Sequence, residues 1–255
     1  MFFVLNFDII VIMSIKKVLK MFFISKYYLY NCKKLFAFTL AEVLITLLII
    51  GVVASIVIPN LIQDSQEKEL HVAYKKGLST FTQAFARIRM DNGGTLAGVF
   101  QFSITSFQNQ FSPYLNISKY SYTVRPGGPN ETWHDYQECK KLNGDIAADM
   151  SCHNCPSGRF QDGSLFMIFY SGTRSNLNTC NTAGTYPKDG LCFNIAYDVN
   201  GKKPPNVFGR DIYILSVYRD KVVPADWILD IGSTNESSCS TSSSGYGCAI
   251  KYAKE

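Results

Sequence analysis

One group of residues with types and spacing suited to chemistry is the loop DVNGKKPPNVFGRD, which runs from Asp198 to Asp211. Asp198, Asn200 and Asp211 offer side-chain oxygens, and the loop adds backbone carbonyls, a set that hard cations such as Ca²⁺ take. The same residues suit a hairpin turn, in which Asn200 and the glycine after it adopt positive φ and Asp211 caps a backbone amide. The spacing of an EF-hand is absent, so the turn is favoured over a calcium site.

The cysteines form the second group with chemical potential. Cys152, His153 and Cys155 could supply half of a zinc site or a redox pair, but no second pair of ligands and no βαβ pattern accompanies them. Seven of the eight cysteines lie in a region rich in Ser, Asn, Gly and Thr, namely Cys139, Cys152, Cys155, Cys180, Cys192, Cys239 and Cys248. This usage is typical of structural disulfides outside the cytoplasmic membrane, so disulfides are favoured over metal.

Two disulfides can be suggested from the spacing of these cysteines. Cys239 and Cys248 bracket a serine-rich stretch, which predicts a surface loop closed by a disulfide, and Cys180 with Cys192 is a second candidate pair. Because seven is odd, one thiol is expected to stay free or to bond to another subunit. The histidines accompany no serine or carboxylate arrangement that would be catalytic, so the chain is predicted not to be an enzyme.

The net charge of +5 is confined to the beginning of the 255-residue chain. Residues 1–37 hold six Lys and one acidic residue, and the rest of the chain is formally neutral. No basic face is therefore expected for a nucleic-acid partner. Basic residues ahead of an apolar span predict a cytoplasmic N-terminus and a domain on the outer side of the membrane.

That apolar span, residues 38–58, contains a single charge, Glu42. A helix of this length is about 31 Å long, close to the hydrocarbon thickness of a bilayer. A secretory signal peptide would have a shorter apolar core followed by a cleavage site. A buried core helix or a plain anchor leaves the carboxylate unexplained, unless Glu42 snorkels to the interface, because a charge at the bilayer centre costs about 2.5 to 3.5 kcal/mol.

The segment AFTLAEVL, which begins at Ala37, resembles the processing and methylation motif of type IV pilins and type II secretion pseudopilins. The resemblance implies that a prepilin peptidase cuts before Phe38 and methylates the new amine, which makes Glu42 the fifth residue. Gly51 and Pro59 are then the 14th and 22nd residues, where many family members have Gly and Pro. Ala37 departs from the usual glycine, and cleavage is still expected because alanine is small.

The resemblance implies a structural subunit whose partners are identical or related subunits, the peptidase, an inner-membrane assembly platform and lipid. In the filament, Glu42 of one chain would meet the Phe38 amine of its neighbour, because each charge alone is penalised in an apolar bundle. The loop from Asp198 to Asp211 resembles a motif of the pseudopilin sheet, which favours a pseudopilus over a type IV pilus. The alternative is a membrane-tethered metal-binding module or enzyme that uses Cys152 and Cys155.

The sequence predicts four parts. Residues 1–37 are a basic leader that is removed, with a natural start expected at Met21, and residues 38–59 are a transmembrane or filament-core helix. Residues 60–94 are an amphipathic helix and residues 95–255 an extracytoplasmic domain. The apolar stripe of the amphipathic helix is Leu70, Tyr74, Leu78, Phe81, Phe85 and Ile88.

Three apolar runs in the domain predict strands: residues 164–171, 191–199 and 211–218. Residues 95–160 show no sustained period and are expected to be loop with short helical pieces. The predicted fold is α+β and pilin-like, with a long N-terminal helix packed on a small antiparallel sheet and with disulfide-closed loops.

Overall fold

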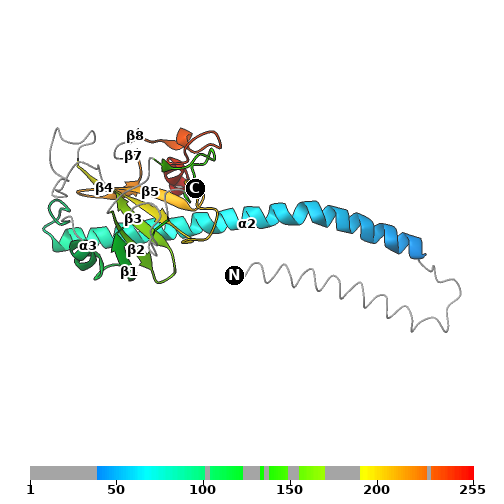
Figure 1. The fold of residues 1–255 in the computed structure, drawn as a ribbon, viewed down its shortest axis with the longest axis horizontal. Coiled ribbons are helices and arrows are strands. Elements are labelled where there is room, and N and C mark those ends of the chain that lie inside the picture. The colour runs from blue at the N-terminus through cyan, green and yellow to red at the C-terminus, as the bar shows by residue number, and fades with distance from the viewer. Residues whose placement is uncertain are drawn as a thin grey trace. The chain divides into compact units, whose positions relative to one another are not determined.

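The structure is a computed structural model that describes residues 39–100, 104–122, 133–134, 138–148, 155–169, 190–228 and 231–255. The chain divides into two compact units, residues 1–60 and 61–255. Helix α2 (Leu40–Asp91) begins in the first unit and ends in the second (Figure 1). The second unit also contains α3 (Ile104–Phe111), β1 (Ile117–Tyr122), β2 (Pro156–Phe160), β3 (Leu165–Phe169), β4 (Leu191–Asp198), β5 (Ile212–Tyr218), β6 (Val222–Pro224), β7 (Trp227–Ile228), β8 (Gly232–Ser233), a 3₁₀ turn (Glu236–Ser238) and α4 (Cys248–Lys254).

Strands β1 to β6 form one antiparallel sheet in which each strand pairs with the next along the chain. Every residue of β4 and β5 is buried. A strand that is covered on both faces has a mostly continuous apolar sequence, and this pattern made the three strands predictable. The three predicted strands are confirmed as β3, β4 and β5. The α+β class is therefore correct.

The main core lies between the sheet and the part of α2 that belongs to the second unit. The predicted stripe is confirmed, because Tyr74, Phe81, Phe85 and Ile88 are at most 2% exposed. Burial of each such side chain is worth about 1.5 to 3 kcal/mol. The Phe81 ring stands edge-on to that of Tyr197 on β4, with centroids 5.4 Å apart.

A close approach at Gly77 lets α2 reach the sheet. A Cβ at this position would lie 2.1 Å from the Tyr197 ring, which is itself buried. Two other glycines form the turn that ends the helix. Gly93 and Gly94 have positive φ, and the Gly94 amide donates to the Arg89 carbonyl at 2.8 Å. Glycines with positive φ commonly follow the last turn of a helix, and α2 ends at Asp91, three residues before the predicted bound of 94.

The opposite face of the sheet has its own core, made by alternate strand residues such as Leu165, Met167 and Ile214. Irregular segments cover this face and contribute Phe208 and Tyr246, whose rings meet edge-on with centroids 5.1 Å apart. The sheet is thus sandwiched between a helix and loops.

The expectation of loop for residues 95–160 is wrong in part. The short helix α3 is there, but β1 and β2 also lie in this region and extend the sheet at its edge. Strand β2 has the sequence PSGRF, whose Pro and Gly are depleted in strands. Gly158 is needed there because a Cβ would lie 2.4 Å from the Phe166 ring on β3. Packing against β3 requires glycine at position 158, so the local sequence does not indicate a strand here.

Candidate functional site

Residues 40–58 present an apolar surface. Among the described residues, α2 is the one helix long and apolar enough to cross a membrane. Its side chains in this part are exposed, with Leu48 at 67%, Ile50 at 62% and Ile56 at 63%. An apolar surface of this kind marks a region that contacts lipid or another protein.

Glu42 lies at the start of this surface and caps the helix. Its Oε2 accepts hydrogen bonds from the Thr39 backbone amide at 2.7 Å and from the Thr39 hydroxyl at 3.0 Å. The Glu42 amide in turn donates to Thr39 Oγ1 at 3.2 Å. This reciprocal pair is a capping box, which the spacing Thr-x-x-Glu could have predicted and which the sequence analysis missed. Ala37 and Phe38, the predicted processing residues, lie outside the described residues.

The remaining polar groups of the apolar segment are satisfied within the helix. The Thr46 hydroxyl donates to the Val43 carbonyl at 2.9 Å, and the Ser55 hydroxyl donates to the Val52 carbonyl at 2.7 Å. Gly51 has no atom within 4 Å of the place where a Cβ would stand, and Pro59 lies inside the helix. The segment therefore exposes no unsatisfied hydroxyl to apolar surroundings.

The loop from Asp198 to Asp211 is organised as a turn held by two buried carboxylates. Asp211 accepts hydrogen bonds from the amides of Asn206 at 2.8 Å and Val207 at 2.7 Å. Asp198 accepts one from the Asn200 amide at 3.0 Å. These contacts match the part of the turn interpretation in which a carboxylate caps backbone amides. The predicted positive φ is found at Gly201 but not at Asn200; the non-glycine residue of the loop with a positive φ is Asn206.

Asp198 has a further partner that its sequence neighbourhood did not indicate. Nε2 of the buried His134 lies 2.6 Å from Asp198 Oδ2. Burial raises the pKa of Asp198 to about 6, and it also raises the pKa of Asp211. No local signal links two residues 64 positions apart, so only the fold brings them together.

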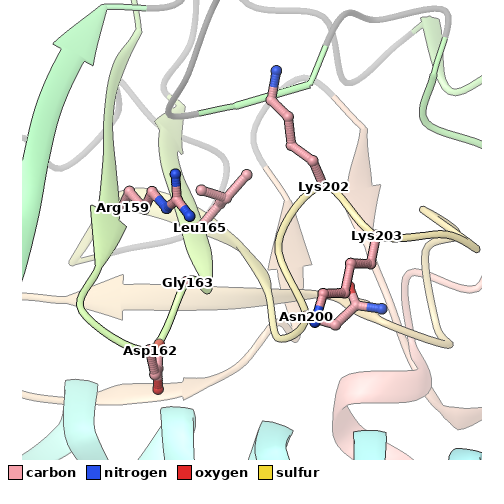
Figure 2. A pocket seen from close by; sticks show the side chains of 7 residues that line it. All are labelled: Arg159, Asp162, Gly163, Leu165, Asn200, Lys202 and Lys203. Atoms are coloured by element: carbon pink, nitrogen blue, oxygen red, sulfur yellow. The ribbon is translucent and has the colours of Figure 1, made fainter.

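The surroundings of this loop disfavour the predicted calcium site. No group of three or more His, Cys, Asp or Glu side chains among the described residues is arranged to hold a metal ion. Lys202 and Lys203 line a cavity beside the loop together with Arg159, as Figure 2 shows. Three positive side chains next to the loop repel a cation, and the Asp198 and Asp211 carboxylates already accept the bonds described above.

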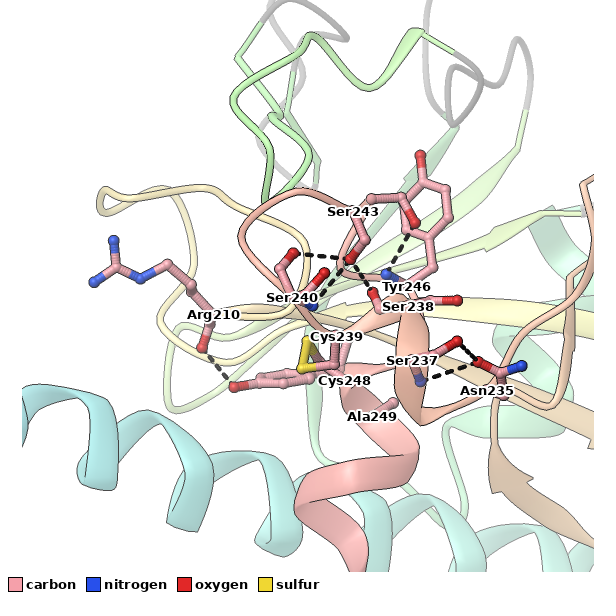
Figure 3. Close-up of a disulfide and its surroundings, with 12 residues drawn as sticks. Arg210, Asn235, Ser237, Ser238, Cys239, Ser240, Ser243, Tyr246, Cys248 and Ala249 are labelled. Atoms are coloured by element: carbon pink, nitrogen blue, oxygen red, sulfur yellow. Dashed lines mark hydrogen bonds between the residues drawn. A yellow bond between two sulfur atoms is a disulfide. The ribbon is translucent and has the colours of Figure 1, made fainter.

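The predicted disulfide between Cys239 and Cys248 is confirmed, with Cα atoms 4.6 Å apart (Figure 3). Within the closed loop, the Ser243 hydroxyl donates to the carbonyl of Ser238 at 2.6 Å. Cys248 is also the first residue of α4, and the Ala249 carbonyl accepts a hydrogen bond from the buried Tyr74 hydroxyl at 2.8 Å. The disulfide therefore ties the start of α4 to the end of the 3₁₀ turn, and the Tyr74 hydrogen bond attaches α4 to α2.

Two further cysteines, Cys155 and Cys192, are disulfide-bonded. Cys152 and Cys180 lie outside the described residues, so the predicted pairing of Cys180 with Cys192 stays a prediction. Cys139 keeps its thiol, as the odd number predicts for one of the seven cysteines, and it lies buried in the core on the face of the sheet opposite α2. A buried cysteine of this kind behaves as a small apolar side chain.

Comparison of the chain with protein-family models, with curated proteins and with solved structures gave no match.

Proposed function

We propose that the chain is a prepilin-like structural subunit of a type II secretion pseudopilus or a type IV pilus. It is processed before Phe38 and assembles through the first part of α2. The observation that carries the proposal is the exposed apolar surface of residues 40–58 with Glu42 at its beginning. No described residue buries this surface, which supports lipid, a second subunit, or each in turn as its partner.

The geometry of Glu42 is compatible with a helix that lies first in lipid and then against a second subunit. Both Thr39 hydrogen bonds go to Oε2, and Oε1 has no hydrogen-bond partner among the described residues. The carboxylate can therefore cap its own helix and still accept the Phe38 amine of a neighbouring subunit at Oε1. Pairing the two opposite charges removes the penalty that each would carry alone in an apolar bundle.

The disulfides support the proposed location of the domain outside the inner membrane. The bond between Cys239 and Cys248 requires an oxidising compartment. The same chemistry weighs against the alternative of a tethered zinc module or enzyme. A cysteine binds a metal as a thiolate, whereas the Cys155 sulfur is in a disulfide.

N-terminal mass spectrometry of the chain purified from membranes tests this function. The expected mature protein begins at Phe38 and carries a methylated amine. A tethered enzyme needs no such cut, so a mature chain that retains Lys33 and Lys34 would overturn the proposal. Cells that lack the prepilin peptidase provide the control, in which the leader must persist.

A further inference from the structure

A cavity of about 480 Å³ lies between two turns of the domain, within the range of roughly 300 to 1,000 Å³ that is usual for small-ligand sites. One wall comes from strands β2 and β3 and the turn between them, and it includes Arg159 and Leu165 (Figure 2). The other wall is the loop that follows β4, with Asn200, Lys202 and Lys203. The cavity is thus built from segments far apart in the sequence.

The cavity carries positive charge that the protein does not neutralise. Arg159, Lys202 and Lys203 have no acidic partner among the described residues. Asp162 also lines the cavity, but its Oδ1 accepts from the amide and the hydroxyl of Ser164, and its Oδ2 pairs with Lys76 at 3.4 Å. An anion in the cavity would relieve the repulsion between the three cations.

The two walls are held together by a contact that only glycine permits. Gly201 has a φ of 72°, and a Cβ there would lie 2.4 Å from the carbonyl oxygen of Gly163 on the other wall. Leu165 in the first wall is 1% exposed and packed in the core. The backbone of both walls is therefore fixed before a ligand arrives, and the exposed side chains of the three cations extend from it.

From these features we infer that the cavity binds a small polyvalent oxyanion. Arg159 provides a fork for a carboxylate or phosphate, and Lys202 and Lys203 provide point charges. A polycarboxylate and a sugar phosphate share this chemistry. The site is independent of the filament proposal, because it uses neither Phe38 nor Glu42.

Isothermal titration calorimetry of the full chain in a non-ionic detergent tests the site with two probes, citrate and glucose 6-phosphate. Binding of either probe is expected at millimolar concentration or below, and the stronger one identifies the preferred oxyanion. Neutral glucose should not bind. The double variant Lys202→Gln/Lys203→Gln should weaken binding by about tenfold or more for each lost contact.

The matched control is Lys68→Gln/Lys75→Gln, which removes the same charge from two exposed lysines of α2 that do not line the cavity. The control should bind the probe as the parent chain does, and near-ultraviolet circular dichroism should show that both double variants are folded. Absence of binding by the parent chain, or an equal loss in both double variants, would overturn the inference. An equal loss would mean that the overall charge attracts the anion.

Discussion

Both parts of α2 carry large apolar side chains, but these side chains meet different surroundings. In residues 40–58, large side chains such as Leu48 and Ile56 are more than 60% exposed. In residues 61–91, Phe81 and Ile88 are completely buried in the second unit. The first part is apolar around its whole circumference, whereas the second is apolar along one stripe and charged elsewhere. A helix that is apolar around its whole circumference can be covered by lipid or by several other subunits. A helix with one apolar stripe can bury that stripe against a single domain.

The comparison has a consequence for mutagenesis. Substitutions in residues 40–60 should change membrane attachment or assembly while the domain stays folded. Substitutions in residues 61–91 should change the stability of the second unit. Each experiment below separates these two outcomes.

The largest effect is expected from Glu42→Ala, which removes both the helix cap and the proposed partner of the neighbouring Phe38 amine. Leaving one member of a buried ion pair alone costs about 3 to 5 kcal/mol, so filament yield should fall by about a hundredfold or more. The variant should stay in the membrane fraction, because its span becomes more apolar. Sheared filaments and membranes are quantified separately.

Glu42→Gln sharpens this test, because glutamine can complete a capping box but carries no charge. If charge pairing drives assembly, the glutamine variant should fail as the alanine variant does. A normal filament yield from Glu42→Gln would show that the hydrogen bonds with Thr39 suffice and that the charge has no role in assembly.

A matched pair of isoleucines compares the two parts of the helix directly. Ile88→Ala should lower the free energy of unfolding of the second unit by about 2 to 5 kcal/mol, because it leaves a cavity in the core. Ile50→Ala changes a side chain that is 62% exposed, and its effect on that unit should stay within about 0.5 kcal/mol. Urea unfolding in detergent measures both, and similar losses would contradict the division.

The double variant Cys239→Ser/Cys248→Ser tests how the C-terminal helix is held against α2. Opening this short loop should cost about 2 to 3 kcal/mol of the free energy of unfolding. The hydrogen bond from Tyr74 to the Ala249 carbonyl should weaken with it, which hydrogen exchange of α4 can follow. Membrane attachment should be unchanged, and loss of attachment would mean that the domain also positions residues 40–58.

The pH dependence of stability should belong to the second unit. Burial raises the pKa of Asp198 from its ordinary value of 3.8 to about 6 in the folded chain, so the folded state holds this proton more tightly. The contribution of Asp198 is therefore greatest below about pH 4 and declines by about 2 to 3 kcal/mol as the pH rises through about 6. Asp198→Asn should remove this component, measured as the difference between the two unfolding curves; identical curves would contradict it.

The smallest effect is expected from a pair of glycines on the same helix. Gly77→Ala should destabilise the second unit by about 1 to 3 kcal/mol, because the new Cβ meets the buried Tyr197 ring. Gly51→Ala meets no atom within 4 Å and should strengthen the local helix by about 0.5 to 1 kcal/mol. Thermal unfolding followed by circular dichroism ranks the two variants, and tolerance of alanine at position 77 would show that the ring can move.

Several features could be predicted because the determining interactions are local. The stripe from Leu70 to Ile88 has the helical period, and the strands β3 to β5 are continuous apolar runs. The Cys239–Cys248 loop needs only two nearby cysteines and a flexible serine-rich stretch. The Thr39–Glu42 capping box is equally local, since it needs only the spacing Thr-x-x-Glu.

The sequence by itself determined that an apolar helix with one carboxylate precedes a charged amphipathic helix and a cysteine-rich domain, because composition and period along one segment carry that information. Only the tertiary structure decided that PSGRF is a strand, that His134 meets Asp198, and that Arg159, Lys202 and Lys203 line one cavity. The His134–Asp198 contact joins residues 64 positions apart, the cavity joins two separate turns, and the strand is defined by its neighbours in the sheet. Such pairings come from sheet register and close packing, which no single stretch of sequence encodes.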